Sequence, residues 1–140
     1  MPTRILALDP GEKRIGLAIS DELGWTAQGL PTLESRGMVN DLAHLAGVVS
    51  EYRIDEIVVG IPYREDGTLG DGGTQAMGLV ATLTERFQLP VTPWDERLTT
   101  KQAERLLIEG GVSRAKRKLS RDRLAAVLIL QSYLDARRPA

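Results

Sequence analysis

The sequence predicts an α/β fold, a five-stranded mixed sheet flanked by helices on both faces. The chain opens with three β-like segments in succession and then alternates helical and β-like segments. One later segment, residues 54–61, is almost continuously apolar, as is typical of strands that are buried on both faces. An antiparallel start followed by alternating helix and strand indicates a mixed sheet between two layers of helices.

The first two predicted strands form a hairpin. The apolar run Ile5–Asp9 ends at a Pro-Gly turn, and β-like character resumes over Ile15–Ser20. A weaker strand over Gln28–Glu34 completes a meander. Asp9 is therefore expected at the last position of a buried strand, where a rigid carboxylate can bind a divalent metal or orient a phosphate. A turn-forming aspartate before Pro-Gly is the alternative interpretation.

The middle of the chain alternates helix and strand. Apolar residues recur at three- and four-residue spacing over Val39–Tyr52, which predicts an amphipathic helix. The apolar strand Ile54–Ile61 ends at a proline, and the glycine-rich segment Tyr63–Gly73 is predicted to be a flexible loop. A second helix is predicted over Thr74–Phe87, with its first threonine as the N-cap.

The last part of the chain contains one more strand and two more helices. The short strand Pro90–Trp94 leads directly into Asp95-Glu96-Arg97. Thr99 or Thr100 is expected to cap a third helix that ends at a pair of glycines. A basic loop follows, and Ser120 is predicted to cap the final helix. This element order is that of the ribonuclease H-like fold.

Composition restricts the chemistry of any site. The 140 residues, 42% hydrophobic and 26% charged, suit one globular domain over residues 1–140. The absence of cysteine excludes disulfides, thiolate metal sites and a cysteine nucleophile. With His44 as the only histidine, zinc sites and a Ser-His-Asp triad are poor fits, so a bound metal would be Mg²⁺ or Mn²⁺. No signal peptide or membrane span is evident, and we expect a cytoplasmic location with no membrane partner.

Charge is unevenly distributed along the chain. The net charge of −1 does not by itself indicate nucleic-acid binding. However, residues 114–123 contain six basic residues and one acid, Asp122; the basic ones are Arg114, Lys116, Arg117, Lys118, Arg121 and Arg123. Such a segment can bind a phosphate backbone, although a solvated surface is the alternative.

Three acids from distant parts of the sequence are the candidate site. In this fold the ends of the strands that carry Asp9 and Glu96 lie at one edge of the sheet, and the first turn of the last helix carries Asp122. Because clustered carboxylates repel one another, the cluster requires cations. Two metals about 3.5–4 Å apart can activate water and stabilise the leaving oxygen in phosphodiester cleavage. As alternatives, Asp122 favours a helix N-terminus by its charge, and Glu96 pairs with Arg97.

Asp95 competes with Glu96 for the same role. In an extended segment, adjacent side chains point to opposite faces, so only one of the two acids can face the site. We predict that Glu96 faces the site and keep Asp95 as the alternative.

Four segments of the chain resemble the YqgF/RuvX family. They are Leu6–Asp21, Val58–Pro62 with Asp66–Thr68, Asp95–Thr100, and Asp122–Ala126 with Leu130-Gln131. They occur in the family's order and span essentially the whole chain. The resemblance implies a ribonuclease H-like fold and a metal-dependent nuclease, and Asp9, Glu96 and Asp122 match its proposed catalytic acids.

The expected roles follow from that site. Asp9 would bind both metals, while Glu96 and Asp122 would each complete one coordination shell. Arg14 and Arg97 would contact the scissile phosphate or serve as structural ion-pair partners. The basic residues would hold the substrate backbone beside Asp122; they are Arg114, Lys116, Arg117, Lys118 and Arg121.

The expected substrate is nucleic acid. The resemblance implies maturation of the 5′ end of pre-16S rRNA, with a ribosomal particle as a further partner. Alternatives are resolution of Holliday junctions in branched DNA, a non-catalytic RNA-binding factor in ribosome assembly, and an actin-like ATPase that would need a second such domain. The expected oligomeric state is a monomer or a weak homodimer; two symmetric cuts in a junction would require the dimer.

Overall fold

The computed structural model describes residues 4–97 and 114–137, and for residues 114–123 it describes the backbone alone. The strands are β1 (Ile5–Pro10), β2 (Arg14–Ser20), β3 (Ala27–Glu34), β4 (Glu56–Ile61) and β5 (Val91–Asp95), and the helices are α1 (Met38–Glu51), α2 (Asp71–Phe87) and α4 (Arg114–Arg137). The predicted strands and the first helix are confirmed to within two residues at each end. The predicted third helix and its caps Thr99 and Thr100 lie outside the described residues.

The five strands form one mixed sheet in the order β3-β2-β1-β4-β5. Strands β1 and β2 pair antiparallel, as do β2 and β3, whereas β1 pairs parallel with β4 and β4 with β5. The predicted hairpin is confirmed, and its turn closes by a hydrogen bond of 2.8 Å from the Gly11 N–H to the Arg14 carbonyl. A Cβ at Gly11 would lie 2.9 Å from that carbonyl oxygen, so the turn favours glycine.

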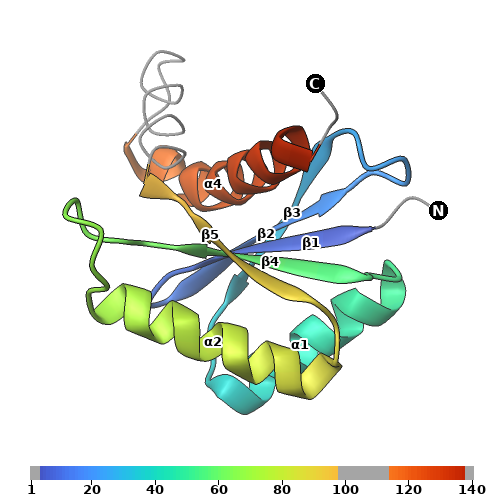
Figure 1. Cartoon of the computed structure of the whole chain (residues 1–140), viewed down its shortest axis with the longest axis horizontal. Helices are drawn as coiled ribbons and strands as arrows, with labels where there is room; N and C mark the ends of the chain where they lie inside the picture. The colour runs from blue at the N-terminus through green and yellow to red at the C-terminus, as the bar shows by residue number, and fades with distance from the viewer. Residues whose placement is uncertain (1–3, 98–113, 138–140) are drawn as a thin grey trace.

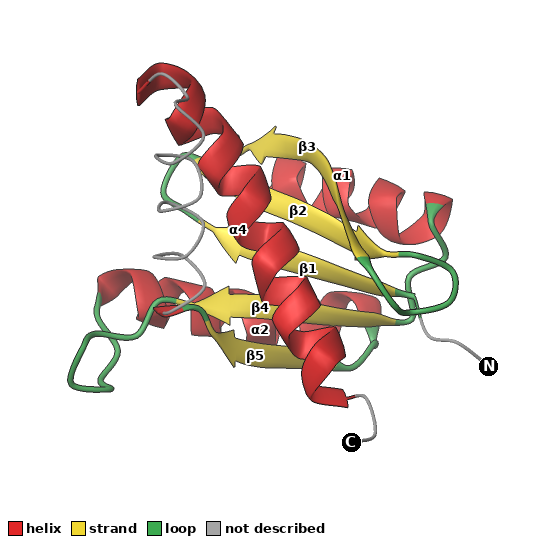
Figure 2. Ribbon diagram, turned by 90° about the horizontal axis from the view of Figure 1, so that it is seen from above, coloured by secondary structure: helices red, strands yellow, loops and turns green. Residues whose placement is uncertain are grey.

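Helices cover both faces of the sheet. Helices α1 and α2 lie on one face and α4 crosses the other (Figures 1 and 2). Side chains of β1 alternate between the two cores: Leu6 and Leu8 pack on the α1/α2 side, whereas Ile5 and Ala7 pack on the α4 side. This period of two continues to the end of the strand, so Asp9 points to the α4 side.

The predicted loop between β4 and α2 contains a turn across which Tyr63 and Leu69 pair. Its flexibility stays a prediction. Helix α2 begins at Asp71 with Gly70 as its N-cap, which corrects the predicted start at Thr74. Asp71 favours the first turn by its charge. Gly73 fits there because a Cβ would lie 2.8 Å from the Leu69 side chain.

The basic segment is helical rather than a loop. Helix α4 begins at Arg114, so Ser120 lies within the helix and is not its N-cap. Residues 114–119 are all Ala, Lys, Arg or Leu, and their high helix propensity lets the helix start earlier than the serine suggested. Among the helices in the described part of the chain, none has the length and apolar character needed to cross a membrane.

A buried acid fastens the end of α4 to the sheet. Glu56, at the start of β4, is 8% exposed and accepts hydrogen bonds from the Tyr133 hydroxyl and, at 2.9 Å, from Arg137. The Tyr133 ring also packs edge-on against Trp94 of β5, with ring centroids 5.1 Å apart. These contacts fix how α4 lies over the sheet.

Replacing Glu56 with alanine is expected to lower the free energy of unfolding by about 1–3 kcal/mol, because it leaves the Tyr133 hydroxyl without its acceptor. Urea denaturation would measure the change. The control is Glu51→Ala at the exposed end of α1, which should change stability by less than about 0.5 kcal/mol. Equal effects of the two substitutions would contradict a specific role for Glu56.

Candidate active site

Asp9 stands at the edge of the sheet where three parallel strands end. It lies opposite Gly16 in the β1–β2 ladder and is half-buried. Leu8 pairs with both β2 and β4, and Pro10 pairs with β2, so the backbone that carries this carboxylate is held by strand pairing. The turn-forming role and the site role are therefore compatible: Pro10-Gly11 makes the turn and Asp9 faces the α4 side.

Glu96 follows β5 directly and is buried, with 8% of its surface exposed. Its backbone N–H donates a hydrogen bond of 3.3 Å to the Ile61 carbonyl, which continues the β4–β5 pairing by one residue. Its carboxyl group is hydrogen-bonded to the Asp9 carboxyl group. The structure thus brings together two of the three predicted acids.

Gly60 makes this contact possible. Strand β4 lies between β1 and β5, so Asp9 and Glu96 project from strands about 10 Å apart. A Cβ at Gly60 would lie 2.5 Å from Glu96 Oε2 and 2.6 Å from Ile129 Cδ1. The missing side chain therefore leaves the space that Glu96 occupies. Gly60 is not among the residues predicted from the sequence, although a glycine inside an apolar strand signals a close approach of this kind.

The electrostatics of the pair are those of two acids that share one proton. Burial, the hydrogen bond with Asp9 and the nearby charges of Asp9 and Asp95 raise the pKa of Glu96 from its usual 4.5 to about 10. Two carboxyl groups in contact also offer oxygen donors of the type that Mg²⁺ and Mn²⁺ prefer. A divalent cation would replace the shared proton, so the donor set fits such an ion.

Asp95 has a different partner. Arg97 donates hydrogen bonds to both of its carboxylate oxygens, the shortest 2.6 Å from Nη2 to Oδ2. This guanidinium lowers the pKa of Asp95. The alternative in which Arg97 pairs with Glu96 is therefore wrong. Of the two adjacent acids, Glu96 faces Asp9 and Asp95 lies partly exposed beside Arg97.

The other predicted residues are placed only in part. Arg14 opens β2 across the hairpin turn and is half-buried. Asp122 lies about two turns after the start of α4, which corrects its predicted place in the first turn of the last helix. The first half of α4 also carries Arg114, Lys116, Arg117, Lys118 and Arg121, and side chains are not described there. Within the residues whose side chains are described, no group of three or more histidines and acids is placed to hold a metal.

Comparisons with known proteins show which family the chain resembles. The model of the RuvX family, described as Holliday junction resolvase, matches residues 3–136. A protein of Desulforamulus reducens named "Putative pre-16S rRNA nuclease" is 46% identical over 133 residues, covering 95% of this chain and 97% of that protein. A protein of the same name from Bacillus licheniformis is 50% identical over 135 residues, covering 95% of this chain and 97% of its own.

Solved structures share the fold. Thermus thermophilus RuvC in complex with a Holliday junction superposes with a TM-score of 0.57 at 20% identity, covering 96% of this chain and 95% of that one. The fowlpox virus Holliday junction resolvase gives a TM-score of 0.57 at 13% identity, with coverage of 96% and 99%. These likenesses confirm the predicted ribonuclease H-like fold. Because its family model covers residues 3–136, the chain belongs to the RuvX family of nucleases.

Proposed function

We propose that this protein is a metal-dependent nuclease that cleaves phosphodiester bonds in the 5′-end maturation of pre-16S rRNA. The observation that carries this proposal is the buried contact between Asp9 and Glu96 at the end of the parallel strands. Two acids held together without a cation are costly, so the arrangement makes physical sense as a preformed cation site. The relatives named for pre-16S rRNA supply the substrate.

Asp122 is proposed as the third acid. It precedes Ile129 by about two turns of α4, and this spacing supports a position on the same side of the helix. Ile129 Cδ1 would meet a Cβ at Gly60, directly beside Glu96. Figure 2 shows α4 running from the edge of the sheet where β1, β4 and β5 end toward the opposite edge. These relations support a site built from β1, the end of β5 and the first half of α4.

Divalent cations at these acids would supply a Lewis acid and an activated water for phosphodiester hydrolysis. The protein's own residues set the conditions for that chemistry. Asp9 contributes a carboxylate on a rigid strand, and Glu96 contributes one from a buried position. Both must lose their shared proton, so metal affinity should rise with pH. We propose that cleavage depends on this cation and that the cation is Mg²⁺ or Mn²⁺.

Basic residues of α4 would hold the substrate. Arg114, Lys116, Arg117, Lys118 and Arg121 occupy the helical half that also carries Asp122. A helix gives these cations a fixed spacing, which suits a phosphate backbone better than the loop that the sequence suggested. Arg14 is proposed to contact the same backbone from the β1–β2 turn. A cytoplasmic location and the ribosomal particle as partner stay predictions.

Asp9→Asn is expected to remove cleavage of pre-16S rRNA in Mg²⁺ or Mn²⁺ while the fold is kept. The assay would compare a pre-16S fragment, an unrelated structured RNA and a four-way DNA junction, each with and without EDTA. Circular dichroism would check that the variant is folded. Equal cleavage by the wild type and Asp9→Asn would assign the activity to another site.

The three substrates of this assay distinguish the remaining candidate functions. The family description favours Holliday junction resolution as the second candidate. Paired cuts in the DNA junction by a dimer would support that function. Binding of the pre-16S fragment without cleavage of any substrate would instead support a non-catalytic assembly factor.

A further inference from the structure

We propose that Arg97 is a positioning residue that holds Glu96 in its metal-binding orientation, rather than a ligand of the substrate phosphate. The inference rests on the proposed function of the Asp9–Glu96 pair. It concerns a group of hydrogen-bonded residues on the side of the chain opposite to that pair. The group consists of Asp95, Arg97 and the turn Tyr63–Leu69.

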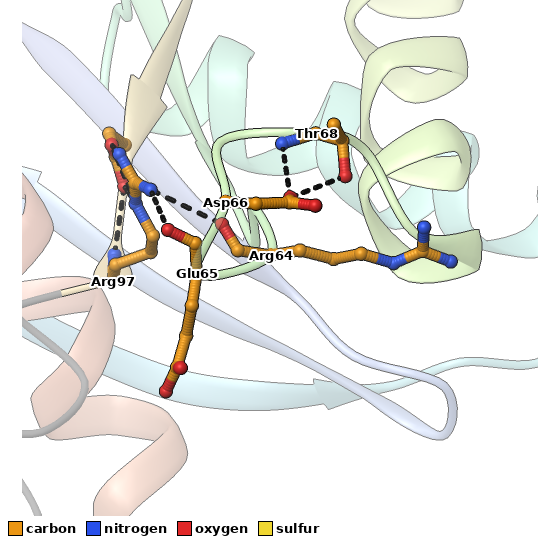
Figure 3. Close-up of polar contacts among 6 residues, drawn as sticks. Arg64, Glu65, Asp66, Thr68 and Arg97 are labelled. Carbon is orange, nitrogen blue, oxygen red and sulfur yellow. Dashed lines mark hydrogen bonds and ion pairs between the residues drawn. The ribbon is translucent and has the colours of Figure 1, made fainter.

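Arg97 uses all of its guanidinium nitrogens inside the protein. Nε and Nη2 donate to the Asp95 carboxylate, and Nη1 donates to the carbonyls of Arg64 at 3.2 Å and Glu65 at 3.5 Å. Figure 3 shows the guanidinium of Arg97 reaching these two carbonyls. The central carbon of the guanidinium, Cζ, also lies 5.7 Å from the centre of the Tyr63 ring. The side chain is 38% exposed, but each guanidinium nitrogen already donates to the protein, so a phosphate would have to compete with these partners.

The turn that receives Arg97 is itself fixed by internal hydrogen bonds. The Arg64 N–H donates to the Thr68 carbonyl and the Gly67 N–H to the Arg64 carbonyl, both at 2.8 Å. The Asp66 carboxylate accepts from the backbone and the hydroxyl of Thr68 (Figure 3). Gly67 has a φ of +86°, which other residues adopt with strain. Arg97 therefore links the end of β5 to a turn that is held by its own hydrogen bonds.

These hydrogen bonds act on Glu96 through the backbone of its two neighbours, Asp95 and Arg97. The Arg97 N–H donates to the Asp95 carboxylate at 3.0 Å, so residues 95 and 97 close a small turn around Glu96. With both neighbours held on one side, the Glu96 side chain is directed to the other, over Gly60 and toward Asp9. The planar fork of arginine is needed, because one ammonium group could not bind the carboxylate and reach both carbonyls.

The test is Mn²⁺ affinity without nucleic acid, measured by calorimetry for the wild type, Arg97→Gln and Arg97→Lys. If Arg97 positions Glu96, both variants should bind Mn²⁺ roughly 10-fold or more weakly. Simple electrostatics predicts the opposite for Arg97→Gln, because removing a cation should strengthen metal binding. If Arg97 were only a ligand of the substrate phosphate, neither variant would bind Mn²⁺ more weakly, and only substrate binding would be weakened.

Two control variants make the outcomes distinct. Arg86→Gln removes an arginine from the end of α2, where its guanidinium stacks on Phe87, and should leave Mn²⁺ affinity unchanged. Asp9→Asn tests the site itself: if it binds Mn²⁺ as well as the wild type does, the proposed function fails. If Asp9→Asn loses affinity while folded Arg97→Lys keeps it, the positioning role is overturned and the proposed function stands. Hydrogen exchange of the amides of residues 64–68 should quicken in both Arg97 variants.

Discussion

Replacing Glu96 with glutamine is expected to abolish cleavage and, without divalent metal, to stabilise the folded protein at pH 8. Glutamine keeps the shape and can still donate a hydrogen bond to Asp9, but it does not have to take up a proton when the chain folds. That uptake costs the wild type about 1.4 kcal/mol for each pH unit above the unfolded pKa, so the gain in the free energy of unfolding is expected to reach about 5 kcal/mol at pH 8. Loss of a metal ligand removes several kcal/mol of transition-state stabilisation, which corresponds to roughly 10³-fold in rate.

The stability difference should depend on pH in a defined direction. Glu96 has a pKa of about 10 in the folded protein and about 4.5 when unfolded, so the folded state holds an extra proton between these values. The wild type therefore loses stability as the pH rises through this window. Glutamine has no such proton to lose. The advantage of Glu96→Gln should be small near pH 4.5 and should grow toward pH 8 and above.

Thermal unfolding in EDTA and in saturating Mn²⁺ would measure both effects. Metal that binds only the folded wild type should raise its melting temperature and reverse the order of the two proteins. A lower stability of Glu96→Gln in EDTA at every pH would contradict the interpretation of the Asp9–Glu96 contact as a strained, metal-free site.

Replacing Gly60 with alanine is expected to be the most damaging single-methyl change near the site. The new Cβ would lie 2.5 Å from Glu96 Oε2 and 2.6 Å from Ile129 Cδ1, so one or both must move. Overpacking of this kind costs about 1–3 kcal/mol of stability. Displacing Glu96 by about 1 Å should also reduce cleavage by roughly 10²-fold.

The matched control is Gly78→Ala in α2, where no atom lies within 4 Å of the added Cβ. It should stabilise the protein by about 0.4–1 kcal/mol, because alanine favours the helix and restricts the unfolded chain. Cleavage should be unchanged, because α2 carries none of the proposed site residues. Urea denaturation and initial cleavage rates would compare the two variants. Wild-type rates in Gly60→Ala would show that Glu96 does not need the space above this glycine.

The structure matches the sequence-based predictions best where neighbouring residues determine it. The Pro-Gly turn and the two apolar runs around it were enough to predict the β1–β2 hairpin and the position of Asp9 at its end. Helical periodicity predicted α1 and most of α2. The errors occurred at helix starts: Thr74 and Ser120 have the side chains of N-caps, but packing around Gly73 and the helix propensity of residues 114–119 let both helices begin earlier.

By itself, therefore, the sequence determined the elements, the fold class and the acids that could form a site. Only the tertiary structure decided which acids meet. Asp9 and Glu96 are far apart in the chain and lie on strands separated by β4, so their contact depends on the strand order and on the missing side chain of Gly60. The tertiary structure also shows that Arg97 forms its ion pair with Asp95 rather than with Glu96. Local patterns do not contain this information, because pairing across a third strand is a long-range property of the folded sheet.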